Sequence, residues 1–231
     1  GISRETGEKL TEKYFVNMKP FKTPKPSRIK ESQKTPKTLI KHKKTEQAHL
    51  ALGVRTVPVS SEEKYPLSVL ASLLGGGMTS KLYQSVRERK GLVYSIHSML
   101  NTFMDVGQIN IYAATDPEKV QQVVDLILTE LKKIKKSGLR RSDLELYKTQ
   151  VTGGILLGAD DVDNRMNSLG VNEMVFEKYR SVESVVDEIN KVSVDSVHDY
   201  LDEKMKLSTL SGVLLGPSLS QVEKWWKDLE V

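Results

Sequence analysis

The sequence contains no cysteine, and this absence excludes several kinds of site. Without cysteine there is no disulfide framework, no thiol nucleophile and no zinc site built from thiolates. A chain without disulfides suits a reducing compartment, so we expect the protein in the cytoplasm.

Long hydrophobic runs are also missing. The longest apolar stretches, VVDLIL and GILLGA, fall far short of the roughly 20 residues that span a bilayer. The first residues show no charged segment followed by an apolar one, as a secretory signal would. We therefore expect no membrane partner. With 231 residues and 38% hydrophobic content, the chain can bury one large core or two small ones.

Common catalytic and metal-binding signatures are absent as well. None of the four histidines, His42, His49, His97 and His198, has a glutamate and a second histidine at metal-binding spacing. The strand-like surroundings of His49 and His97 are more typical of packed or surface histidines than of ligands. No G-x-S-x-G nucleophile motif occurs, and the acidic run ADDVDN lacks the glycine and distal glutamate of a calcium loop. Helix capping is the better interpretation of that run.

Positive charge is concentrated in one segment, residues 20–44. It holds nine lysines and arginines against the single acid Glu31, so it carries +8, whereas the whole chain carries +5 and the remainder therefore −3. The segment also holds four prolines and lacks apolar periodicity, which predicts an extended linker. Nucleic-acid surfaces usually interleave aromatic residues with basic ones, and only Phe21 is present here. We expect no nucleic-acid partner.

The linker divides the chain into three parts. Residues 1–19 form one amphipathic helical segment with Leu10 and Tyr14 on one side, and a single helix has no partner with which to form a core. We interpret it as the remnant of a preceding N-terminal half. Residues 45–231 are predicted to be the folded domain.

Strand and helix patterns alternate within that domain. AHLALGVRT, YSIHSML, GQINIYAAT and LSTLSGVLLG are strand-like, and the middle two predict an antiparallel hairpin. Asp116 and Pro117 begin the clearest helix, whose apolar stripe continues until Gly138 ends it. Further helices are predicted over 161–176, 182–190 and 194–204. The order predicts an α+β domain with helices layered on a mainly antiparallel sheet.

The run Gly75, Gly76 and Gly77 connects two predicted helices, the second ending near Lys90 with Gly91 expected in a left-handed conformation. Ordering three glycines costs more backbone entropy than ordering any other residues. Either the backbone turns in a way that side chains forbid, or another part of the chain passes close to it. We favour the tight turn, because this is the commoner use of glycine.

The stretch LGGGMTSKLYQSVRERKGLVYS carries a family resemblance, together with EQAHLALG before it and GQINIYAATDPEKV after it. It resembles the C-terminal half of the pitrilysin or insulinase-like zinc metallopeptidases, close to the bacterial two-repeat relatives of mitochondrial processing peptidase. The resemblance covers residues 45–216, and EKLTEKYF resembles the end of the family's N-terminal half. It implies one half of the clamshell metallohydrolase fold that this family shares with LuxS-like proteins.

The resemblance also implies a division of labour between two halves. In such enzymes the first half binds zinc through H-x-x-E-H and a downstream glutamate, and the second half contributes substrate-binding groups across the cavity. This chain lacks H-x-x-E-H. The implied activity, a zinc-dependent endopeptidase acting on peptides or unfolded segments, therefore requires a zinc-bearing half from the same precursor or a separate subunit, and the chain alone is expected to be inactive. A non-catalytic assembly subunit, like the core subunits of respiratory complexes, is the alternative. Whether the chain forms a homodimer stays open.

The resemblance assigns roles to individual residues. The family's arginine and tyrosine, seven residues apart, correspond to Arg87 and Tyr94. A tyrosine hydroxyl can donate to the oxyanion of peptide hydrolysis, and a guanidinium can hold peptide carbonyls with several donors. The other interpretations are a solvated helix residue for Arg87 and a strand core residue for Tyr94. The run Gly75 to Gly77 resembles the glycine-rich loop of the processing-peptidase subunit that lacks zinc, which implies a second role in substrate binding.

Overall fold

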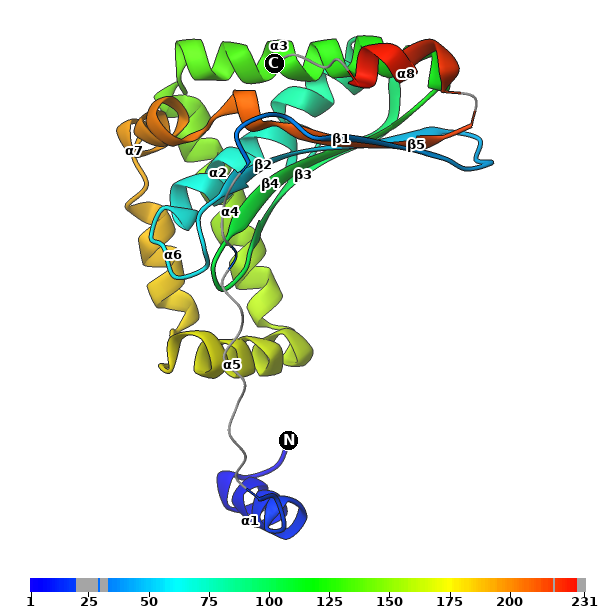
Figure 1. Ribbon diagram of the computed structural model, residues 1–231. Coiled ribbons are helices and arrows are strands. Elements are labelled where there is room, and N and C mark those ends of the chain that lie inside the picture. The colour runs from blue at the N-terminus through cyan, green and yellow to red at the C-terminus, as the bar shows by residue number, and fades with distance from the viewer. Residues whose placement is uncertain (20–28, 30–32, 218, 228–231) are drawn as a thin grey trace. The chain divides into compact units, whose positions relative to one another are not determined.

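The computed structural model describes residues 1–19, 29, 33–217 and 219–227. It contains two compact units, Gly1–Lys30 and Glu31–Val231 (Figure 1). The first unit is built on α1 (Arg4–Phe15), which begins after Ser3, whose hydroxyl accepts a hydrogen bond from the backbone of Thr6. No residue of α1 is buried, and its apolar side chains, Leu10 and Tyr14 among them, are exposed. This helix has no core of its own.

A five-stranded sheet forms the centre of the second unit. Its strands are β1 (Thr38–His42), β2 (Ala48–Thr56), β3 (Val93–Thr102), β4 (Gly107–Thr115) and β5 (Ser211–Gly216). Their order is β1-β5-β2-β4-β3, and every pair is antiparallel except β1 with β5. The predicted α+β class, the mainly antiparallel sheet and the β3–β4 hairpin are therefore confirmed.

Helices cover one face of this sheet (Figure 1). The helical elements of this unit, of which α5 lies away from the sheet, are α2 (Lys64–Gly75), η1 (Tyr83–Glu88), η2 (Pro117–Lys119), α3 (Val120–Ser137), α4 (Arg141–Ala159), α5 (Val162–Phe176), α6 (Val182–Asn190), α7 (Val194–Asp199), η3 (Tyr200–Lys204), η4 (Leu207–Thr209) and α8 (Ser220–Lys227). The α3 stripe is buried from Val120 to Ile134 and ends at Gly138, as predicted. Trp226 of α8 is fully buried, and a Cβ on Gly212 of β5 would overlap its ring.

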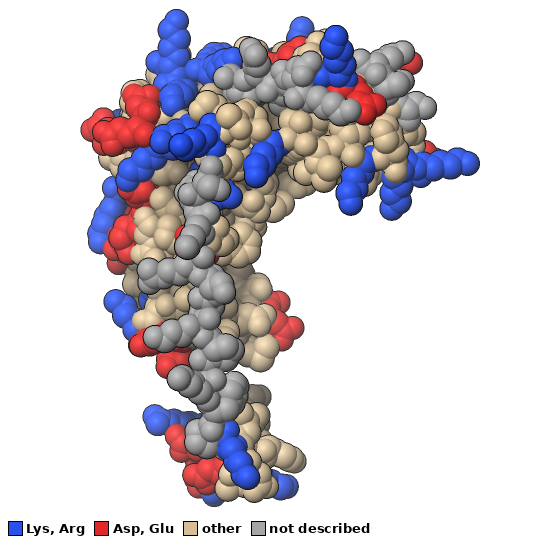
Figure 2. Space-filling view, viewed as in Figure 1, with Lys and Arg blue, Asp and Glu red and all other residues tan. Residues whose placement is uncertain are grey.

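The other face of the sheet is left open by the described residues of this unit. Along β2 the buried residues Leu50, Leu52 and Val54 alternate with half-buried ones such as His49 and Ala51. Strand geometry sends alternate side chains to opposite faces, so the half-buried set defines the open face. The hollow beside the sheet in Figure 2 is largely free of charged side chains.

The predicted boundary between linker and domain is wrong. Residues 38–42, inside the predicted linker, form β1 and pair in parallel with β5. The Nε2 atom of Gln33 also donates to the carbonyl of Thr209 at 2.9 Å and to the hydroxyl of Ser211 at 2.7 Å. Edge strands commonly carry lysine, which discourages further pairing. Lys41 therefore gave this strand the composition of a linker. Residues 20–28 and 30–32 of the predicted linker lie outside the described residues.

Candidate functional site

The glycine run connects α2 to η1 through a turn, in which the N–H of Ser80 donates to the carbonyl of Gly77 at 3.0 Å, but no glycine of the run has a positive φ angle. Positive φ angles among the glycines occur at Gly91 and Gly138, and Gly76 has φ −80° and ψ 1°. Close packing explains the run instead. A Cβ on Gly75 would overlap the backbone nitrogen of Ser98, and one on Gly77 would lie 2.9 Å from the side-chain amide of Gln150. A side chain at either position would therefore force the neighbouring atoms to move.

Gly75, the last residue of α2, is buried against β3, whereas Gly76 is exposed and Gly77 is half-buried. The carbonyl of Gly76 accepts a hydrogen bond of 2.9 Å from Nε2 of Gln150 in α4. The run is thus held from two sides, by the sheet and by α4. Only its second and third glycines are available to a ligand.

Arg87 lies in η1, a short π-helix in which a backbone N–H donates to the carbonyl five residues earlier, as that of Arg89 does to Gln84. Such segments often occur at functional sites. The Arg87 guanidinium lies 4.9 Å from the ring centre of Tyr83, on the same helix. Gly91 ends the turn with φ 58°, and its N–H donates to the carbonyl of Arg87 at 2.9 Å. The left-handed conformation predicted for Gly91 is therefore confirmed.

Tyr94 occupies an irregularity at the start of β3, the strand at the sheet edge. Val93 pairs with Thr115 and Ser95 pairs with Ala114, so Tyr94 is an additional residue with no partner on β4. Bulges of this kind redirect a side chain and are frequent beside active sites. Tyr94 is 63% exposed, and its hydroxyl forms no hydrogen bond within the described chain. It is not a core residue of the strand.

The structure places Arg87 and Tyr94 on successive elements, η1 and β3, that contact each other. Val86 and Val93, their immediate neighbours, are buried, and this packing fixes both backbones. Both candidate side chains are exposed, and no hydrogen bond or ring contact joins them in the part of the chain that the structure describes. The two groups are therefore free to contact a third partner.

A row of polar rings on the sheet was not recognised in the sequence as a cluster. Nδ1 of His49 on β2 and the hydroxyl of Tyr112 on β4 form a hydrogen bond of 2.7 Å. The ring of His97 on β3 lies 4.9 Å from that of Tyr112, centre to centre. Strand alternation puts all three on one face, but only the β2-β4-β3 order, which the sequence does not reveal, makes them neighbours.

The ring cluster of His49, Tyr112 and His97 does not fit a zinc site. Among the described residues, no three or more histidine, cysteine, aspartate or glutamate side chains gather in a way that could hold a metal ion. The acidic run ADDVDN caps a helix instead, because the Asp161 carboxylate accepts a hydrogen bond of 2.8 Å from the backbone of Asn164 at the start of α5.

Among the helices described, none is long and apolar enough to cross a membrane.

Comparison with known proteins identifies the family to which this chain belongs. Residues 1–151 match the family described as peptidase M16 inactive domain. The chain belongs to this family, which confirms the resemblance found in the sequence.

Two curated relatives are named uncharacterized zinc proteases. The one from Mycobacterium tuberculosis is 36% identical over 164 residues, which cover 71% of this chain and 37% of the relative. The one from Bacillus subtilis is 36% identical over 160 residues, which cover 69% of this chain and 39% of the relative. The chain thus spans less than half the length of these relatives.

Solved structures share the fold at low sequence identity. A protease from Helicobacter pylori has a TM-score of 0.82 at 19% identity, covering 94% of this chain and 53% of that one. The peptidase M16 inactive domain from Pseudomonas fluorescens gives 0.79 at 18%, covering 94% and 52%. A chain of complex III2 from Candida albicans gives 0.80 at 16%, covering 97% and 54%. In each case the match takes up about half of the other chain.

Proposed function

We propose that this domain is the substrate-binding half of a zinc metalloendopeptidase that cleaves peptides or unfolded segments. The observation that carries the proposal is Tyr94: a bulge turns it out of the strand, and its hydroxyl has no hydrogen-bond partner in the described chain. A large aromatic residue that is mostly exposed and forms no hydrogen bond contributes little to the fold. It is available to donate to a ligand.

The chemistry of the two side chains suits peptide hydrolysis. Attack of water on a peptide carbonyl creates an oxyanion, and a neutral phenol hydroxyl such as that of Tyr94 stabilises it by donating a hydrogen bond. The Arg87 guanidinium offers five N–H donors, which can hold the carbonyl groups of an extended peptide before and during the reaction. Gly76 and Gly77 extend this surface, since they let a peptide approach the backbone closely.

Zinc has to come from another half. The described residues offer no metal-binding group, and the relatives named zinc proteases are more than twice as long as the matched segment. We propose that the partner is the zinc-bearing half, supplied by the same precursor or by a second subunit. The exposed apolar residues of α1, Leu10 and Tyr14 among them, provide a surface that such a half would cover.

A non-catalytic assembly role is the second candidate. The fold is shared with a chain of complex III2 from Candida albicans, so this architecture also occurs within a larger complex. Assembly alone gives no reason for a solvent-exposed tyrosine at a bulge, and so the enzyme is favoured. The two candidates differ in whether peptide hydrolysis appears when the halves are combined.

The test combines the purified chain with a zinc-bearing half that contains H-x-x-E-H, taken from the same genome. Hydrolysis of a quenched fluorescent peptide should require both proteins, and zinc measured by elemental analysis should copurify with the zinc-bearing half alone. A mixture treated with chelator should lose activity and regain it when zinc is restored. A stable complex of the two proteins with bound zinc and no hydrolysis would favour the assembly role.

A further inference from the structure

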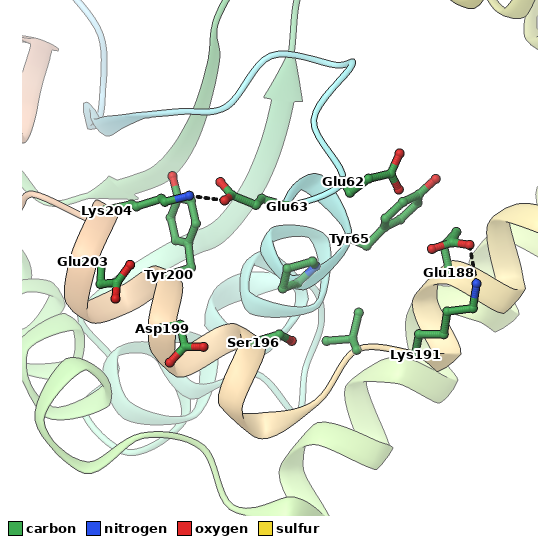
Figure 3. A pocket seen from close by; sticks show the side chains of 12 residues that line it. Glu62, Glu63, Tyr65, Glu188, Lys191, Ser196, Asp199, Tyr200, Glu203 and Lys204 are labelled. Atoms are coloured by element: carbon green, nitrogen blue, oxygen red, sulfur yellow. Dashed lines mark hydrogen bonds and ion pairs between the residues drawn. The ribbon is translucent and has the colours of Figure 1, made fainter.

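A pocket lies among α2, α6, α7 and η3 and contains none of the residues proposed for hydrolysis. Its volume is about 460 Å³. Figure 3 shows where its side chains come from: the turn before α2, the C-terminal end of α6, helix α7, and η3. Four separate parts of the chain therefore form its walls. The volume is in the range of pockets that hold small ligands or a few side chains.

The walls carry an excess of negative charge. Two lysines, Lys191 and Lys204, line the pocket together with five carboxylates: Glu62, Glu63, Glu188, Asp199 and Glu203. Lys204 pairs with Glu63, and Lys191 pairs with Glu188 at 2.6 Å. The other three carboxylates form no ion pair within the described chain. They leave a charge of about −3 facing the cavity.

Tyr200 supplies an independent indication of a ligand. This residue is only 5% exposed, lines the pocket, and forms no side-chain hydrogen bond within the described residues. In Figure 3 its hydroxyl points toward the place where Glu63 and Lys204 meet. Burial and the charge of Glu63 raise the pKa of Tyr200 to about 12, so the hydroxyl keeps its proton and remains a donor. The Tyr200 hydroxyl is not one of the fully enclosed polar atoms that lack a partner, so water reaches it in the empty pocket and a ligand can replace that water.

The chemistry of the walls selects the ligand. A single metal ion is a poor fit, because the described chain gathers no three metal-binding side chains at one point. Tyr65, Pro66 and Val192 provide apolar surface between the charged groups. Carboxylates beside apolar surface suit a side chain with an aliphatic stem and a cationic end, which describes lysine and arginine.

We propose that this pocket binds a lysine or arginine side chain of an extended peptide. Glu62, Asp199 and Glu203 attract the cation by their combined charge without converging on it, and the Tyr200 hydroxyl donates to a carbonyl of the same peptide. Binding here does not require the zinc-bearing half. The proposal therefore stands or falls separately from the proposed peptidase.

Fluorescence anisotropy of the full chain with a labelled Gly-Gly-Arg-Gly-Arg-Gly-Gly peptide tests the proposal. A second peptide with norleucine in place of both arginines keeps the length and the apolar stems but removes the charge. The arginine peptide should bind about tenfold more tightly or better, and its affinity should fall as salt screens the carboxylates. No binding of the arginine peptide, or equal binding of both, would refute the pocket's assignment.

Variants then locate the site. The double change Glu62→Gln with Asp199→Asn should weaken binding about tenfold, and Tyr200→Phe should weaken it about threefold to tenfold, the effect of one neutral hydrogen bond. Glu118→Gln with Asp125→Asn is the matched control, since both residues are exposed and lie outside the pocket. Thermal melting should show that every variant is folded. Equal weakening by the control pair would mean that the peptide binds through general charge alone.

Discussion

Gly75 at the end of α2 lies against the backbone of Ser98 in β3, with no space for a side chain between them. A Cβ on Gly75 would come within 2.8 Å of the carbonyl carbon of His97 and would overlap the nitrogen of Ser98. One turn earlier in the same helix, the carbonyl of Ala71 accepts a hydrogen bond of 2.5 Å from the Ser98 hydroxyl. Helix and strand are therefore in direct backbone contact beside the candidate site.

Gly75→Ala should destabilise the domain by about 1 to 3 kcal/mol, because the added methyl group overpacks a contact between two backbones. Gly154→Ala in α4 is the control, since a Cβ there meets nothing within 4 Å. That change should stabilise the domain by about 0.5 to 1 kcal/mol through lower entropy of the unfolded chain. Urea unfolding of both variants measures the contrast, and an unaffected Gly75→Ala would show that α2 and β3 can separate freely.

Much of the fold was predictable because its signals are local. The α3 stripe, Gly138 and the left-handed Gly91 each depend on residues within a few positions of one another, and all three are confirmed. The predicted helices over 182–190 and 194–204 match α6 and the α7–η3 segment. Periodicity and helix-ending glycine were sufficient in these places.

The remaining features depend on distant parts of the chain. β1 is a strand only because β5, some 170 residues later, pairs with it. The Tyr94 bulge appears only in register with β4, since alternation within β3 does not reveal an extra residue. The close approach that requires glycine at position 75 was not the favoured interpretation, because it depends on the nearby backbone of Ser98, which no local pattern contains. The site is therefore less predictable than the elements that carry it.

Trypsin should distinguish the corrected domain boundary from the one that the sequence suggested. Cleavage is expected first among the basic residues between Lys22 and Lys34, leaving a fragment that starts close to residue 35 and retains β1. The Lys41 peptide lies within the strand, and the N–H of Lys43 donates to the carbonyl of Gly216 at 3.0 Å, so cleavage there requires unpairing from β5.

N-terminal sequencing of the stable fragment gives the answer. Digestion in denaturing urea is the control, because Lys41, Lys43 and Lys44 should then all be cut. A native fragment that starts at Thr45 would mean that β1 detaches readily from the sheet.

Asp143 should make stability depend on pH in the acidic range. Burial alone would raise the pKa of its carboxyl group, but hydrogen bonds from Lys81 and Arg140 and their charges lower it below the ordinary value. The Nζ of Lys81 lies 2.9 Å from Oδ2 of Asp143, which links the segment before η1 to the start of α4. A folded-state pKa below the unfolded value stabilises the protein above the unfolded value, and this contribution is lost as the pH falls through the folded one.

Asp143→Asn should therefore cost roughly 1 to 2 kcal/mol at pH 7. The difference from the wild type should shrink as the pH falls below about 4, the ordinary pKa of an aspartate. Asp125→Asn, an exposed change on α3, should show no such pattern. Urea unfolding at several pH values measures all three proteins, and a difference that stays constant down to pH 3 would contradict the ion-pair explanation.

The roles of Tyr94 and Arg87 can be separated once the domain is combined with a zinc-bearing half. Tyr94→Phe removes only the hydroxyl, and the ring contributes little to the core because it is 63% exposed. If the hydroxyl donates mainly to the developing oxyanion, the turnover number should fall by about 10² to 10³ with little change in the Michaelis constant. Arg87→Ala should instead raise the Michaelis constant, because a group that holds the peptide throughout contributes equally to the ground and transition states.

Steady-state kinetics with melting temperatures recorded alongside test this contrast, and Tyr83→Phe serves as the matched control. Tyr83 also presents a phenol ring on η1, where it contacts the Arg87 guanidinium, but it lies outside the proposed oxyanion contact. Its variant should keep the turnover number, since the ring that supports Arg87 is retained. A Tyr94→Phe enzyme with full turnover would remove the catalytic role from that residue. A loss of activity that follows the melting temperature would make Tyr94 a structural residue instead, and only an unchanged melting temperature with reduced turnover fits donation to the oxyanion.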